Sequence, residues 1–336
     1  MKKNMKMIAV FMAVALIVCF AAGCGQKSDP AAEKTSDGGL KIVTTIFPEY
    51  DWVMNVLGDK ADGADVTMLL DNKVDLHSYQ PTADDLMKIS ECDIFIYVGG
   101  ESDEWVEDAL KGAANKDMKV IDLMGLIGDK AKEEEIVEGM EEEEEEHGEG
   151  EEDEEEGPEY DEHVWLSLRN AEIIVSAIGD TLAEEDPDNA DAYKANAAAY
   201  TEKLNELDGR YEEAVKAGKK DTVLFGDRFP FRYMFDDYGL KYYAAFVGCS
   251  AETEASFETV TFLANKVDEL GLDFVMTIDG SDQAIARTII ENTKTGSQKI
   301  LILDSMQTAA IDDFNKGKTY LDSMESNLTV LAEALA

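Results

Sequence analysis

Three histidines are the only imidazole side chains in this chain of 336 residues, and their positions define its candidate chemistry. His77 lies in the segment Asp75-Leu76-His77-Ser78-Tyr79, and His163 lies in Asp161-Glu162-His163-Val164-Trp165. His147 lies inside a run of glutamates. A neutral imidazole is the commonest side chain for binding a transition metal. Two such donors among carboxylates therefore predict a single metal site.

Acidic side chains that follow expected strands are the second part of this interpretation. In open α/β sheets, ligands bind beyond the carboxyl ends of the strands. His77 follows an expected strand in the first half of the chain, and Asp227, Asp279 and Asp304 each follow one in the second half. A lone histidine is more often a surface or capping residue, and an aspartate there commonly caps a helix. It is the convergence of these residues on one cleft that favours a metal site.

The elements that must position these residues follow an alternating pattern. Short β-rich runs alternate with helical stretches, which is typical of parallel sheets flanked by helices. Four runs lie in each half, so we expect an α/β fold with two similar lobes, each built on a four-stranded parallel sheet. The expected strands cover residues 41–46, 65–70, 93–98, 119–123, 222–225, 242–247, 274–278 and 300–303.

The strongest helix signal lies between the two halves, at residues 187–217. Asp186 can cap this helix, Pro187 suits its first position, and Gly218 can end it. One apolar stripe recurs at steps of four and three, formed by Tyr193, Ala197, Tyr200, Leu204, Leu207 and Tyr211. At 1.5 Å per residue the helix is about 45 Å long. We expect this single helix to join the lobes rigidly. The alternative is a helix that forms a coiled coil with a partner, but six apolar positions are few for a coiled coil.

The N-terminal segment is expected to lie outside the fold. A basic start and an apolar stretch at residues 8–22, short for a transmembrane helix, indicate a secretory signal. Ala21-Ala22-Gly23 before Cys24 resembles the lipobox of bacterial lipoproteins, which implies lipidation of Cys24; a cleaved signal that leaves a soluble protein is the alternative. The resulting division is signal peptide 1–23, lipid-anchored tether 24–39, first lobe 40–186, linker helix 187–217 and second lobe 218–336.

The charge of the chain is concentrated in one insert. The net charge is −43, and residues 133–163 contain twenty Asp or Glu and no Lys or Arg. Such a surface repels nucleic acid and anionic lipid headgroups, which excludes nucleic acid as a partner. The acidic insert at residues 133–162, with His147, is either an inert solvated spacer or a weak collector of cations near the cleft.

Two cysteines remain within the expected fold, Cys92 and Cys249. A disulfide between them is possible outside the cytoplasm. We favour two buried free thiols, because each cysteine borders an apolar strand-like run.

From about residue 41 to the end, the chain resembles the zinc- and manganese-specific solute-binding lipoproteins of bacterial ABC importers (the ZnuA/TroA-like family). The segments that carry the resemblance lie at residues 75–82, 163–171, 186–196, 231–240, 254–256 and 303–305. The acidic insert stands where zinc-type members often carry a His-rich loop. The resemblance implies an extracytoplasmic receptor, anchored to the membrane and monomeric, that delivers its metal to an ABC permease with a cytoplasmic ATPase.

The resemblance also implies a set of metal ligands. The family's two metal histidines fall on His77 and His163, and its C-terminal carboxylate falls on Asp304. The third ligand, a His or Glu in relatives, would lie at Arg228, which stays protonated and cannot bind a metal. Asp227 is the expected substitute, and a site with three protein ligands and a water is the alternative.

Two imidazoles with two carboxylates suit Zn²⁺ in four-coordination and also suit Mn²⁺. We expect zinc as the transported ligand, with a Mn²⁺-specific receptor as the alternative. The sequence contains no activated nucleophile beside a base and no glycine-rich phosphate loop, so we expect no enzyme. A metallohydrolase, a surface adhesin and an acidic cation-buffering protein are the competing functions.

Overall fold

The computed structural model describes residues 39–71, 73–141, 159–250 and 254–336, which belong to one compact unit. The expected signal peptide, Cys24, His147 and the middle of the acidic insert lie outside the described residues. Among the described residues, no helix combines the length and the hydrophobicity needed to cross a membrane.

The first half of the compact unit contains a four-stranded parallel sheet in the order β2-β1-β3-β4. Its strands have mostly apolar sequences, as expected for a sheet covered on both faces. The strands are β1 (Leu40–Thr44), β2 (Ala64–Met68), β3 (Ile94–Tyr97) and β4 (Lys119–Asp122). The helices are α1 (Phe47–Leu57), α2 (Ala83–Glu91), α3 (Trp105–Gly112) and α4 (Leu123–Ile127). All four strands expected in this half are confirmed, with boundaries that differ by one or two residues.

The second half has four strands arranged as two parallel pairs, β5-β6 and β7-β8. The strands are β5 (Thr222–Leu224), β6 (Lys241–Tyr243), β7 (Phe274–Ile278) and β8 (Lys299–Leu303). The helices are α7 (Arg232–Tyr238), α8 (Phe257–Leu270), α9 (Ala284–Asn292), α10 (Ile311–Asn315) and α11 (Tyr320–Ala334). A single bridge between Phe225 and Met276 connects the two pairs. The α/β prediction with parallel strands is confirmed, and the sheet expected in this half is divided because β5 and β6 are only three residues long.

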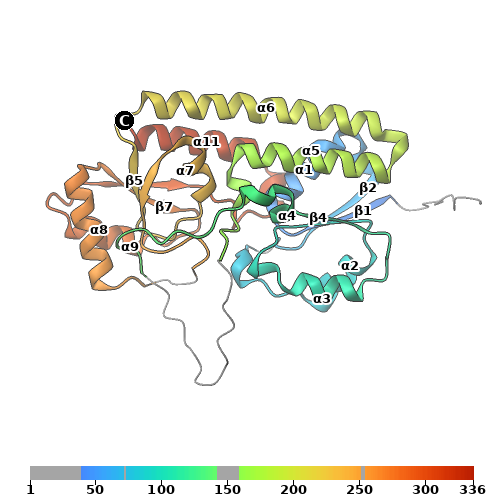
Figure 1. The fold of residues 1–336 in the computed structure, drawn as a ribbon, viewed down its shortest axis with the longest axis horizontal. Helices are drawn as coiled ribbons and strands as arrows, with labels where there is room; N and C mark the ends of the chain where they lie inside the picture. The colour runs from blue at the N-terminus through green and yellow to red at the C-terminus, as the bar shows by residue number, and fades with distance from the viewer. Residues whose placement is uncertain (1–38, 72, 142–158, 251–253) are drawn as a thin grey trace, which may run out of the picture. The chain divides into compact units, whose positions relative to one another are not determined.

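The long helix α6 spans Ala190–Ala217 and packs against α5 (Leu168–Glu185) and α11 (Figure 1). A single 3-10 turn at Pro187–Asn189 precedes it, with Pro187 at the start as expected. The buried residues of α6 are the six that form the apolar stripe in the sequence: Tyr193, Ala197, Tyr200, Leu204, Leu207 and Tyr211. The predicted helix and its buried face are therefore confirmed.

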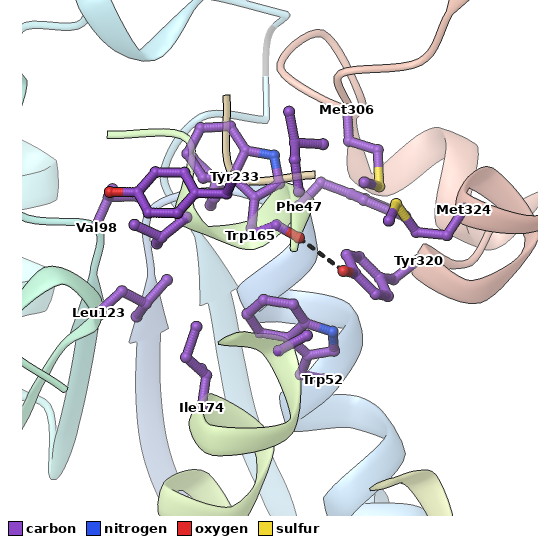
Figure 2. Packing of buried hydrophobic residues seen from close by; sticks show 14 of the residues in the cluster. Phe47, Trp52, Val98, Leu123, Trp165, Ile174, Tyr233, Met306, Tyr320 and Met324 are labelled. Atoms are coloured by element: carbon purple, nitrogen blue, oxygen red, sulfur yellow. Dashed lines mark hydrogen bonds between the residues drawn. The ribbon is translucent and has the colours of Figure 1, made fainter. Parts of the chain in front are cut away.

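A shared hydrophobic core joins residues from both halves around Trp165. The Trp165 indole Nε1 donates to the Ser305 carbonyl oxygen at 2.9 Å. The Trp165 carbonyl oxygen accepts a hydrogen bond from the Tyr320 hydroxyl at 2.7 Å, which Figure 2 draws beside Trp52 and Phe47. Residues of the second half therefore hold the first-half segment that carries His163, which lies two residues before Trp165.

Candidate metal centre

The two histidines occupy similar local structures in the first half of the chain. His77 lies in a 3-10 turn (Leu76–Ser78) that follows β2, and the Asp75 carboxylate accepts a hydrogen bond from the His77 backbone N–H at 3.1 Å. His163 directly precedes a second 3-10 turn (Val164–Leu166), and the Asp161 carboxylate accepts from the His163 backbone N–H at 2.8 Å. In each case an aspartate two residues before the histidine fixes its backbone.

The structure brings the two imidazoles into direct contact. The Nε2 atoms of His77 and His163 are 3.2 Å apart, and the His163 and His77 side chains are 0% and 7% exposed. Two nitrogen lone pairs at this distance repel each other unless a proton or a cation lies between them. The pair is thus a buried site with two convergent nitrogen donors.

Neighbouring oxygen atoms determine how the imidazoles are oriented. The His163 Nδ1 atom lies 3.1 Å from the Asp161 Oδ1 atom. The His77 Nδ1 atom lies 2.9 Å from the Ser102 Oγ atom and 3.4 Å from the Glu162 Oε2 atom. Carboxylates that accept the Nδ1 proton leave Nε2 free to bind a metal, an arrangement common behind zinc-binding histidines. The sequence analysis missed these roles of Asp161 and Glu162, although both residues directly precede His163.

The protonation preferences of His163 and Glu162 agree with this arrangement. Burial lowers the pKa of His163 well below its usual value, and neighbouring His77 and Arg228 lower it further. Burial raises the pKa of Glu162, but hydrogen bonds from His77 and Ser102 outweigh this effect and the net shift is downward. His163 is therefore neutral and Glu162 ionised at neutral pH, the forms that metal binding requires.

Two glycines leave room for the carboxylates and the imidazole. Gly100 has φ +84°, and a Cβ atom there would lie 2.4 Å from the Glu162 Oε1 atom. A Cβ atom at Gly248 would lie 3.1 Å from both the Asp161 Oδ2 atom and the His163 Cε1 atom. A larger residue at either position would displace the groups that hold the imidazole pair.

Two side chains of the second half, Gln307 and Arg228, lie beside the pair in a way that the sequence did not predict. The Gln307 Nε2 atom lies 2.7 Å from the His163 Nε2 atom and 3.4 Å from that of His77. Arg228 donates to the Gln307 Oε1 atom at 3.2 Å and forms an ion pair with Asp75. Residue 228, where the resemblance places the third ligand, therefore carries a guanidinium that connects the two halves. Gln307 lies four residues after β8, at an edge where ligand residues are expected.

The structure does not bring the two predicted aspartate ligands to the imidazole pair. Asp227 accepts hydrogen bonds from the backbone N–H groups of Arg228 at 3.0 Å and Ile278 at 3.4 Å. Asp304 forms an ion pair with Lys318 at 2.7 Å. Asp304 also accepts hydrogen bonds from the Ser323 hydroxyl and the Met306 backbone N–H. The third strand-end aspartate, Asp279, accepts hydrogen bonds from the hydroxyls of Ser305 and Thr308. Metal ligation by Asp227 and Asp304 thus stays a prediction, and it requires both carboxylates to leave these partners.

A cysteine that was not predicted as a ligand lies beside the two imidazoles. Within the described parts of the chain, the ligand atoms of His77, His163 and Cys249 lie within 4.8 Å of one another and form a group able to hold one metal ion. Both Cys92 and Cys249 are free, as predicted; Cys92 is buried and Cys249 only partly so. Cys249 follows the expected strand at 242–247, so the rule that placed the aspartates at strand ends also applied to it.

The described ends of the acidic insert lie beside this group. Glu133 and Tyr160 form an antiparallel bridge, and the Glu134 carboxylate accepts a hydrogen bond from the Cys249 backbone N–H at 3.1 Å. The insert therefore begins and ends next to the candidate metal centre.

Comparisons with known proteins identify the family of the chain. The family model of the zinc-uptake complex component A, periplasmic, matches residues 42–334. The chain is 31% identical over 337 residues to the zinc-binding lipoprotein AdcA of Streptococcus pneumoniae, covering 99% of this chain and 61% of AdcA. It is 29% identical to the high-affinity zinc uptake system protein ZnuA of Bacillus subtilis, covering 95% of this chain and 96% of that protein. The chain thus spans less than two thirds of the length of AdcA.

A solved structure extends the likeness to three dimensions. The Zn(II)-bound ZnuA-like domain of Streptococcus pneumoniae AdcA has a TM-score of 0.67 and 28% sequence identity, covering 89% of this chain and 99% of that domain. The crystal structure of the metal-dependent lipoprotein YcdH from Bacillus subtilis has a TM-score of 0.69 at 24% identity, covering 88% of this chain and all of that one. This second likeness concerns the fold.

Proposed function

The chain belongs to the family of the periplasmic zinc-uptake complex component A, and from this premise we propose that it captures one divalent metal ion between His77 and His163. Zn²⁺ is the favoured metal and Mn²⁺ the alternative. The names of the relatives support zinc, since AdcA is a zinc-binding lipoprotein and ZnuA a zinc uptake protein.

The spacing of the two imidazoles is the observation that carries this proposal. Zinc binds imidazole nitrogen at about 2.0–2.1 Å in tetrahedral sites, so two such nitrogens are separated by about 3.3 Å. The His77 and His163 Nε2 atoms are already 3.2 Å apart. An ion can therefore bind both nitrogens with little movement of the rings, while Asp161 and Glu162 hold the opposite Nδ1 protons.

The proposed role of the protein is supported by its family. It acts as a monomeric receptor outside the cytoplasm, anchored by a lipid on Cys24, and it delivers the ion to an ABC permease and its ATPase. It performs no catalysis. The two lobes at 40–186 and 218–336 joined by α6 allow only small movements, so release depends on rearrangement near the second-half residues. The acidic insert, whose ends contact the site, raises the local concentration of cations by electrostatic attraction.

Metal retention through dialysis tests the proposal. The wild-type chain is expected to retain one equivalent of Zn²⁺, and a double variant His77→Ala/His163→Ala is expected to retain none. His147→Ala is the matched control, because it removes the third histidine from the acidic insert and should leave retention unchanged. A double variant that still holds an equivalent of zinc would contradict the proposal.

Deletion of residues 142–158 separates a receptor from an acidic cation buffer. A receptor keeps stoichiometric zinc binding after the deletion, because His77 and His163 remain. A buffer loses most of its bound ions together with the glutamates.

A further inference from the structure

The thiol of Cys249 is the third metal-binding group beside the two imidazoles. Its sulfur and the ligand nitrogens of His77 and His163 lie within 4.8 Å of one another. We propose that the Cys249 sulfur is the third protein ligand of the transported metal. This inference rests on the proposed function, and it replaces the third ligand that the family resemblance placed at residue 228.

Pairing between two loops of the second half brings Cys249 to this position. The loops that follow β5 and β6 pair through a parallel bridge between Arg228 and Phe246, and the Asp227 carbonyl accepts from the Ala245 backbone N–H at 3.1 Å. The chain then passes His163 at Gly248, where a Cβ atom would come within 3.1 Å of the imidazole. The pairing that occupies Arg228 therefore also directs the next residue, Cys249, towards the imidazoles.

The backbone of Cys249 is held on the opposite side by the acidic insert. Glu134 accepts the hydrogen bond from the Cys249 backbone N–H at 3.1 Å, and Glu133 pairs with Tyr160 in the same region. Tyr160 lies three residues before His163 in the chain. The insert thus connects the cysteine to the segment that carries the second imidazole.

The carboxylates that could compete for this role are committed elsewhere. Asp304 is paired with Lys318 at 2.7 Å, and Asp227 accepts two backbone N–H groups. Arg228 is paired with Asp75 and cannot bind a cation. A thiolate within reach is consequently the donor that completes a three-residue group without breaking these contacts.

A cysteine ligand has a consequence for metal choice. Binding converts the thiol to a thiolate, with the proton released to solvent and the sulfur lone pair donated to the ion. Zinc accepts thiolate sulfur at about 2.3 Å, whereas manganese prefers carboxylate and carbonyl oxygens. Two imidazoles and one thiolate therefore select Zn²⁺ over Mn²⁺.

Cobalt substitution combined with zinc competition tests the assignment in the full chain under reducing conditions. Co²⁺ bound to the wild type should give a thiolate-to-cobalt charge-transfer band in the near ultraviolet, and Cys249→Ser should lose this band. Zinc affinity, measured against a chromophoric chelator, should fall at least about tenfold in Cys249→Ser, because even residues behind a ligand contribute 10- to 100-fold. The ratio of zinc affinity to manganese affinity should be smaller in Cys249→Ser than in the wild type. Cys92→Ala is the matched control and should keep both the band and the affinity.

The outcomes separate this inference from the proposed function. A wild type that binds no equivalent of zinc overturns the proposed function and this inference together. A wild type that binds zinc tightly but gives no charge-transfer band with cobalt overturns only the cysteine ligand. A band that persists in Cys249→Ser also overturns it, because another thiol is then the ligand.

Discussion

The two halves of the compact unit bury different kinds of side chain. Among the described residues, the buried acidic side chains and the buried histidine all come from the first half: Glu49, Asp51, Asp103, Asp161, Glu162 and His163. The second half buries a cluster of stacked and edge-on aromatic rings instead: Phe225, Phe229, Phe231, Phe235 and Tyr242. The metal centre lies where these two kinds of interior meet.

The difference indicates which kinds of side chain each half supplies to the metal centre. Burial makes ionised carboxylates costly, and it raises the pKa of Asp103 and Asp161 to about 7. In the first half, this cost arises where buried carboxyl groups orient the imidazoles, as Asp161 does for His163. The second half supplies neutral or already paired groups to the site, namely Gln307, Cys249 and Arg228. Burial also raises the pKa of Asp227 and Asp237 in the second half, so stability should depend on pH mainly, but not solely, through the first half.

The largest expected effect is in the aromatic cluster. Phe229 is 2% exposed and stacks on Tyr242, with ring centroids 3.6 Å apart. Phe229→Ala should lower the free energy of unfolding by about 4 kcal/mol, because a large buried ring is replaced by a cavity. Urea unfolding should give the same loss at pH 5 and at pH 8.

Phe257 provides the matched control for this variant. It is 81% exposed, so Phe257→Ala should change the free energy of unfolding by less than about 0.5 kcal/mol. If the loss of unfolding free energy in Phe229→Ala differed between pH 5 and pH 8, the proposed difference between the two halves would be contradicted.

A smaller effect with a defined pH dependence is expected at Asp51 in α1. Burial raises its pKa to about 6, although its carboxylate accepts a hydrogen bond from the Tyr200 hydroxyl at 3.0 Å. Between pH 4 and pH 6 the folded state thus binds more protons than the unfolded state, so stability falls as pH rises through this window. The cost is fully present above the folded pKa and amounts to at most about 3 kcal/mol.

Asp51→Asn should remove this cost. The variant should be more stable than the wild type at pH 8, by about 1–3 kcal/mol, and should have no advantage below pH 4. Asp59→Asn is the control, since the Asp59 side chain is 81% exposed and should show no such dependence. Equal effects of Asp51→Asn at both pH values would show that the buried charge is not responsible.

The smallest expected effect concerns the second-half contact with the imidazoles. The Gln307 amide nitrogen lies 2.7 Å from the His163 Nε2 atom and competes with a metal for its lone pair. Gln307→Ala should raise zinc affinity by about three- to tenfold, since a neutral hydrogen bond contributes about 0.5–1.5 kcal/mol. Competition with a chelator measures this change, and Gln298→Ala, which lies before β8 and not after it, is the control. A fall in affinity would instead assign the Gln307 oxygen a direct role in metal binding.

Local patterns in the sequence predicted much of the fold. The six-residue stripe of α6 follows from helical spacing alone, and Pro187 identifies the start of its first turn. The first-half strands follow from continuous apolar runs. The second-half sheet was not predicted correctly, because only one bridge, between Phe225 and Met276, connects the β5-β6 pair to the β7-β8 pair. That pairing depends on contacts between segments that no local pattern reports.

The sequence by itself determined that two histidines are the scarce metal-binding groups and that strand ends carry the candidate ligands. Only the tertiary structure decided which second-half side chains reach them. Asp227 and Asp304 are bound to backbone N–H groups and to Lys318, whereas Gln307 and Cys249 lie beside the imidazoles. The physical reason is that residue type and spacing fix which atoms can bind a metal, but competing partners brought close by folding fix which of these atoms face the site.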